Sequence, residues 1–161
     1  MRVFHWTVVL GCVVDLFILT DGGLVHQAFG YVIAAFLAIR VAWGFVGTGY
    51  ARFADFTPSP RRLAGYLGDL ARGREQRHIG HNPAGAVMML ALMALLAGVC
   101  VTGWMQGLDR FWGVEWIMAL HDGFADAILV LALLHAGAAL IESWRHRENL
   151  VLSMVTGRKR P

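Results

Sequence analysis

Four apolar stretches in this chain each have the length that a helix needs to cross a lipid bilayer. A helix rises about 1.5 Å per residue, so roughly 20 residues cross a hydrocarbon core about 30 Å thick. We therefore predict an all-α integral membrane protein, a four-helix bundle with helices at residues 3–20, 28–46, 84–105 and 116–141.

The amino-acid composition agrees with a membrane protein. Of the 161 residues, 57% are hydrophobic and 16% are charged, whereas soluble domains are nearer half apolar and a quarter charged. A disordered chain is excluded as well, because disorder needs low hydrophobicity and high net charge. Cys12 and Cys100 both lie in apolar runs, so we expect no disulfide scaffold. Neither belongs to a C-x-x-C-H motif, which excludes covalent c-type haem attachment.

The first apolar stretch has features of a mature helix rather than of a cleaved signal peptide. Asp15 interrupts its apolar run, and no small-x-small cleavage site follows it. We therefore count residues 3–20 among the membrane helices.

The distribution of positive charge predicts how the helices cross the membrane. Twelve of the 14 Lys and Arg residues lie at the N-terminus, in the loop at residues 47–83 and in the tail at residues 142–161. The other two loops hold only Arg110. Because cytoplasmic segments carry the excess of Lys and Arg, we expect both termini and the long loop to be cytoplasmic.

The long loop contains a candidate amphipathic helix at residues 60–72. Ser59-Pro60 is a typical helix start, and four apolar residues follow at helical spacing between arginines: Leu63, Tyr66, Leu67 and Leu70. Such a helix would lie on the cytoplasmic membrane surface. A solvated basic loop is the alternative. Asn82-Pro83 predicts the start of the third span in the same way.

Four of the seven histidines lie in or at the ends of the predicted spans: His5, His26, His121 and His135. Ionisable residues inside a membrane are costly and are candidates for function. For any single one, a packed imidazole that hydrogen-bonds between helices is the simpler interpretation.

The predicted depth of the four histidines favours ligation over packing. His135 follows His121 by 14 residues, which is close to four turns and about 21 Å along the same helix face. The predicted topology puts His26 and His121 near the outer surface, and His5 and His135 near the inner one. At each level, two different helices thus contribute one histidine each.

Pairs of imidazoles suit haem iron better than zinc. Structural zinc takes four ligands and catalytic zinc three plus water, and only Asp122 beside His121 could extend the outer pair. Haem iron needs only two axial ligands from the protein. We therefore predict two bis-histidine haems, with His26 and His121 on the outer iron and His5 and His135 on the inner iron. Filled axial positions favour electron transfer over oxygen binding.

Arg40 lies 14 residues after His26, on the same predicted helix face and at the inner level. Its guanidinium would pair with a carboxylate of the inner haem, or else reach the cytoplasmic interface along its own stem. Gly30 and Gly44, each one turn beyond these two residues, would leave room for a flat macrocycle or serve helix packing.

The carboxylates within the predicted spans are less informative. Asp122 and Asp126 are four residues apart near the outer end of the last helix, where we expect them to face water. Asp15 lies within the first span and has no evident partner in the sequence. A proton path and a hydrogen bond to quinone both remain open for it.

With the histidines in place, the chain resembles the bacterial di-haem cytochrome b family, which includes cytochrome b561 and the cytochrome b subunits of nickel–iron hydrogenases. The matching segments are residues 2–6 (RVFHW), His26 with Gly30-Tyr31, Arg40 with residues 43–45 (WGF), residues 51–56 (ARFADF), residues 80–85 (GHNPAG), His121, His135, and residues 146–150 and 156–160 of the tail.

The resemblance implies two haem b groups on these four histidines and a place in a respiratory chain of the bacterial inner membrane. It implies electron exchange between quinone (ubiquinone or menaquinone) and a periplasmic redox protein, such as a c-type cytochrome or hydrogenase. We expect quinone beside the inner haem, near Arg40 and His81. The resemblance assigns no catalytic residue and no nucleic-acid partner.

Two alternatives belong to other functional classes. One branch of the family oxidises superoxide and passes the electron to quinone, and it needs positive charge near the outer haem to steer the anion. The outer loops carry only Arg110 against Asp21, Asp109 and Glu115, which speaks against that activity. The other alternative is a haem-free membrane anchor or small transporter.

Overall fold

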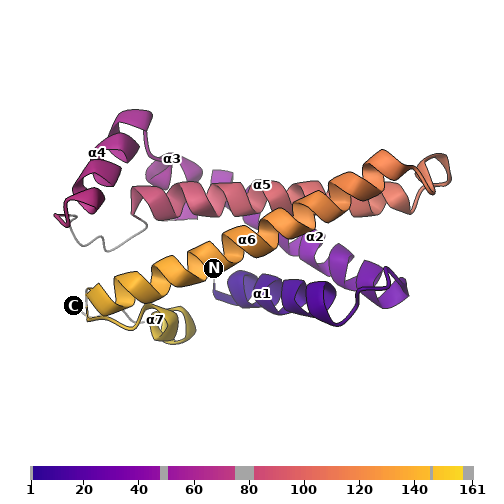
Figure 1. Cartoon of the computed structure of the whole chain (residues 1–161), viewed down its shortest axis with the longest axis horizontal. Helices are drawn as coiled ribbons and strands as arrows, with labels where there is room; N and C mark the ends of the chain where they lie inside the picture. The colour runs from indigo at the N-terminus through magenta and orange to yellow at the C-terminus, as the bar shows by residue number, and fades with distance from the viewer. Residues whose placement is uncertain (1, 48–50, 75–81, 146, 158–161) are drawn as a thin grey trace. The chain divides into compact units, whose positions relative to one another are not determined.

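The computed structural model describes residues 2–47, 51–74, 82–145 and 147–157, so His81 and the end of the tail lie outside the described residues. Secondary structure in the described residues is entirely helical (Figure 1), as the sequence predicted. In chain order the elements are α1 (Arg2–Phe17), α2 (Leu24–Val46), α3 (Phe53–Phe56), α4 (Pro60–Ala71), α5 (Pro83–Gln106), the 3-10 helix η2 (Asp109–Phe111), α6 (Glu115–Arg145) and α7 (Leu150–Thr156).

Three of these helices, α2, α5 and α6, are long and apolar enough to cross a membrane. Most of their side chains are not buried within the protein; Leu24, for example, is 83% exposed and Leu133 is 65% exposed. Apolar surface on this scale requires apolar surroundings. Such a surface is typical of helices in a lipid environment.

The first helix is shorter than the sequence predicted. α1 covers 16 residues, about 24 Å of helix, and ends at Phe17 rather than at Thr20. Its hydrogen-bond ladder closes early because Ile18 N and Leu19 N both donate to Val14 O, each at 2.9 Å. The chain then turns through Gly22, whose φ of 65° suits a residue without Cβ. A fourth membrane span at α1 stays a prediction.

The second helix begins four residues before the predicted start. The Asp21 carboxylate accepts a hydrogen bond from Gly23 N at 3.1 Å, and Gln27 N donates to Gly23 O at 3.0 Å. The carboxylate supports the turn immediately before Leu24, and helical bonding starts at once. His26 therefore lies in the first turn of α2 rather than ahead of it.

Two helix starts follow the side-chain caps that the sequence indicated. Asn82 Oδ1 accepts from Gly85 N at 2.6 Å, and Pro83 is the first residue of α5. Ser59 Oγ accepts from Arg62 N at 3.3 Å ahead of α4. In each case a side chain satisfies a backbone donor that has no partner within the helix.

The chain divides into two compact units, and the first comprises Met1–Ala42 and Leu92–Val130. Its helices pack through glycines. A Cβ on Gly11 of α1 would lie 2.8 Å from Ile33 Cδ1 of α2, and one on Gly98 of α5 would lie 2.8 Å from Phe124 Cε2 of α6. The buried apolar residues of this unit are Ile33, Leu37, Met93, Leu96, Ile117 and Ile128.

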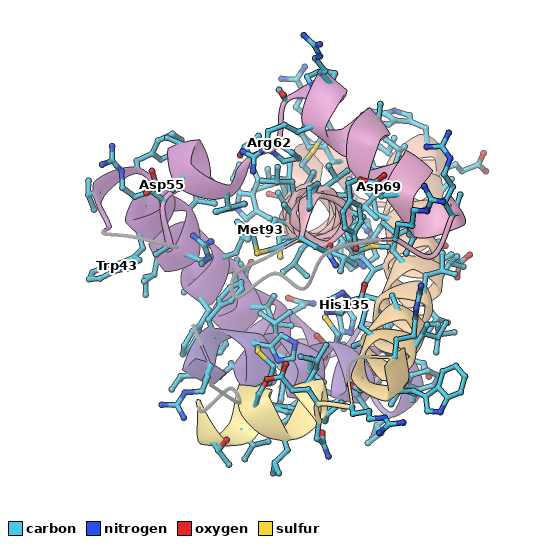
Figure 2. All side chains as sticks on the ribbon, turned by 90° about the vertical axis from the view of Figure 1, so that its left-hand side faces the viewer. Trp43, Asp55, Arg62, Asp69, Met93 and His135 are labelled. Atoms are coloured by element: carbon cyan, nitrogen blue, oxygen red, sulfur yellow. The ribbon has the colours of Figure 1, made fainter. Side chains whose placement is uncertain are left out.

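The second unit comprises Trp43–Ala91 and Leu131–Pro161. Its α4 packs through Tyr66, which is buried and whose hydroxyl donates to Glu142 Oε1 of α6 at 3.2 Å. Asn82 Nδ2 donates to the same oxygen at 3.3 Å. The charged residues Arg62 and Asp69 of α4 are exposed (Figure 2). α4 is thus an amphipathic helix within the range that the sequence indicated.

Candidate functional site

The first unit brings two of the four candidate histidines together. His26 in the first turn of α2 and His121 in the second turn of α6 have ring centroids 6.1 Å apart, with an angle of 70° between the ring planes. Both side chains are partly buried. They are the two residues that the sequence placed at the outer level.

The His121 ring is oriented by α5. Its Nδ1 lies 3.1 Å from Val99 O and 3.2 Å from Thr102 Oγ1. A carbonyl oxygen only accepts hydrogen bonds, so Nδ1 carries the proton and Nε2 keeps its lone pair. Thr102 is buried, and its hydroxyl contacts Gly98 O at 2.8 Å. A Cβ on Gly103 would lie 3.1 Å from His121 Cε1, so the glycine lets the ring approach α5 closely.

The His26 ring faces a carboxylate. Its Nδ1 lies 3.7 Å from Asp15 Oδ1 of α1, and the side chains of His26 and Asp15 are 25% and 12% exposed. Sequence reasoning found no partner for Asp15 and therefore missed this contact. A signal was available, because Asp15 lies two residues before the end of α1 and His26 two residues after the start of α2. A tight helical hairpin brings such positions to the same level.

The outer pair fits a haem iron. Metal-bound histidines usually donate the proton of the other ring nitrogen to a carbonyl or carboxylate, and the Nδ1 atoms of His121 and His26 face one of each. A histidine nitrogen binds a metal ion at about 2.0–2.1 Å, so two rings with centroids 6.1 Å apart could hold one ion between them. The described residues contain no group of three or more His, Cys, Asp or Glu that could hold a metal ion.

The two histidines predicted at the inner level, His5 and His135, are both partly buried. His5 of α1 packs edge-on against Trp6, with ring centroids 5.2 Å apart. His135 projects from α6 (Figure 2). His5 belongs to the first unit and His135 to the second, and their pairing stays a prediction.

The other predicted positions differ in their surroundings. Arg40 is buried, with 4% of its surface exposed, and Asp126, like Asp122, is exposed, as expected. A Cβ on Gly30 would meet nothing within 4 Å, so space is open beside that turn of α2. Gly44 differs, because the ring of Phe53 from α3 lies against it. At Gly44, helix packing is the correct interpretation and room for a macrocycle is wrong.

Comparison with known proteins identifies relatives along almost the whole chain. Three are named as probable Ni/Fe-hydrogenase B-type cytochrome subunits. The one from Bradyrhizobium diazoefficiens is 26% identical over 173 residues, covering 90% of this chain and 69% of the relative. The one from Rhizobium leguminosarum is 27% identical over 161 residues, covering 84% and 67%. The one from Azotobacter vinelandii is 26% identical over 206 residues, covering 98% and 84%.

No solved structure shows a significant match to this chain. The model of the family described as prokaryotic cytochrome b561, in contrast, matches residues 1–157. The chain therefore belongs to the prokaryotic cytochrome b561 family.

Proposed function

We propose that this protein is a di-haem membrane cytochrome that transfers electrons between membrane quinone and a periplasmic redox protein. Family membership supports haem binding and electron transfer, because a b-type cytochrome binds haem b and transfers electrons. The observation that supports the haem site itself is the His26–His121 pair. Its rings are 6.1 Å apart, and the two Nδ1 atoms face Asp15 and Val99 O.

In the outer site, the protein's own residues hold and orient the cofactor. Haem b, when bound, supplies a one-electron iron couple. The Nε2 atoms of His26 and His121 would hold the iron, since the Nδ1 atoms face acceptors. Because His26 and His121 would supply two ligands to the iron, they would leave no position for a substrate such as oxygen, and the site would serve electron transfer. Gly30, with nothing within 4 Å of its Cβ position, leaves space beside His26 for the edge of the macrocycle.

His5 and His135 are the proposed ligands of the inner haem. Arg40 supports this assignment because it is 4% exposed, whereas an arginine that reaches the interface leaves its charged group in water. A carboxylate of a haem bound nearby would be a suitable partner for a guanidinium at this position. The same positive charge would stabilise a reduced quinone head group, and it supports the proposal that quinone binds on the cytoplasmic side.

The redox partner is proposed from the relatives. Their names describe subunits of nickel–iron hydrogenases, so a hydrogenase or another periplasmic redox protein is the proposed partner. The comparisons do not favour a superoxide:quinone oxidoreductase. The outer loops also carry more acidic than basic residues, which would repel superoxide. The topology follows the positive charge, with both termini in the cytoplasm of a bacterium.

The experiment that tests this function is quinol-driven haem reduction by the purified protein in detergent. Two haem b per chain, both reduced by quinol, are expected. Arg40→Gln should slow reduction, while Arg110→Gln on the outer side serves as the matched control. Equal rates in the two variants would contradict the quinone placement, and a preparation without haem would contradict the proposed function itself.

A further inference from the structure

Asp15 is the acidic residue of α1, and the structure places its carboxylate beside the imidazole of His26. Its side chain is 12% exposed, and Oδ1 lies 3.7 Å from His26 Nδ1. Neither atom makes a hydrogen bond within the described residues. An apolar residue at this position would avoid the cost of burying a carboxylate. The contact with His26 is therefore the feature that calls for an explanation.

The separation of 3.7 Å is about 0.5–1 Å longer than a hydrogen bond. A small rotation of either side chain closes such a gap. A histidine whose Nε2 binds a metal has its proton on Nδ1, and that N–H then needs an acceptor. Asp15 is the acceptor within reach of His26.

The two outer histidines differ in the acceptor that faces Nδ1. His121 Nδ1 faces neutral groups, the carbonyl of Val99 and the hydroxyl of Thr102. His26 Nδ1 faces a carboxylate. A carboxylate partner makes the imidazole a more basic ligand than a carbonyl partner does, and a more basic ligand stabilises oxidised iron over reduced iron.

We propose that Asp15 is a positioning residue of the outer haem site, which holds His26 with its proton on Nδ1 and lowers the reduction potential of that haem. The proposal rests on the proposed function, because it requires a haem at His26 and His121. Asp15 itself contacts neither iron nor substrate and acts through His26.

The test is a redox titration of the purified full-length protein in detergent, with the two haems resolved by their absorption and electron paramagnetic resonance spectra. Asp15→Asn keeps the size of the side chain and removes its charge. It should shift the midpoint potential of the outer haem upward and leave the inner haem unchanged. Asp15→Leu removes the acceptor as well, so it should also reduce the content of outer haem. Asp15→Glu should restore a potential close to that of the wild type.

The matched control is Asp109→Asn, which removes an exposed carboxylate from the short η2 helix of the same unit, outside the three long apolar helices. Because water and salt screen an exposed charge, the midpoint potentials of both haems should be unchanged in this variant. The proposal would be overturned if Asp15→Asn left the midpoint potential of the outer haem unchanged, or shifted it only as much as the control does. Loss of both haems from Asp15→Asn would overturn it too, since a positioning residue of the outer site leaves the inner site filled. A wild-type protein that binds no haem would instead overturn the proposed function.

Discussion

Gly98 offers a direct test of how α5 and α6 pack next to the outer histidine. In Gly98→Ala, the new Cβ would lie 2.8, 2.9 and 3.0 Å from three carbons of the Phe124 ring. Carbon atoms pack best at about 3.5–4.0 Å, so the two helices must separate by about 0.7 Å. All three neighbours belong to the ring of Phe124, which can move aside only as a whole.

The expected cost follows from two opposing terms. Overpacking a well-packed contact costs about 1–3 kcal/mol, whereas Ala is favoured over Gly in a helix by about 1 kcal/mol. Gly123→Ala on α6 is the matched control, because its Cβ would meet nothing within 4 Å. The propensity gain cancels between the two variants. The free energy of unfolding should therefore be about 1–3 kcal/mol lower for Gly98→Ala than for Gly123→Ala.

The same substitution should weaken the outer site. Val99 O and the Thr102 hydroxyl, which contact His121 Nδ1, lie within one turn of Gly98 on α5. Thermal unfolding in detergent, followed by circular dichroism and by the haem absorption bands, measures both effects. Gly98→Ala should release one haem below the temperature at which the helices unfold. Equal unfolding of the two alanine variants would refute the packing argument.

Three further outcomes test single contacts of the structure. Thr102→Val removes one of the two acceptors near His121 Nδ1, so both haems should stay while the outer site loses about 0.5–1.5 kcal/mol of stability; unchanged thermal release of haem would argue against this contact. Gly30→Leu fills the open space on α2 and should halve the haem content without unfolding the helices. The control Gly123→Leu should keep both haems. Two haems in both variants would exclude a macrocycle beside Gly30. Tyr66→Phe removes a hydrogen bond that fixes α4 and should speed cleavage of α4 by trypsin, and an unaltered rate would show that this bond does not hold the helix.

Much of the fold could be predicted from the sequence because hydrocarbon imposes strict demands on length and polarity. The end of α5 and the start of α6 each differ from the predicted spans by one residue. Side-chain caps at Ser59 and Asn82 mark two helix starts. The early start of α2 was missed because His26 and Gln27 interrupt the apolar run in its first turn. Polarity alone does not separate a loop from a helix end.

The candidate site was predictable in its residues but not in its supporting contacts. His26 and His121 could be chosen from their spacing and predicted depth, because both quantities depend only on the helix rise and the topology. The roles of Asp15 and Val99 depend on which helix faces lie together. That arrangement follows from close approaches at glycines such as Gly11 and Gly98, and glycines are too common in membrane helices to indicate it beforehand.

The central claim is that His26 and His121 are the two axial ligands of one haem, and the haem content of single variants tests it most directly. The wild-type protein should contain two haem b per chain. His26→Ala and His121→Ala should each contain one, and the spectra of the two variants should match, because both have lost the same haem. Variants that retain different haems, or that retain both, would contradict the claim.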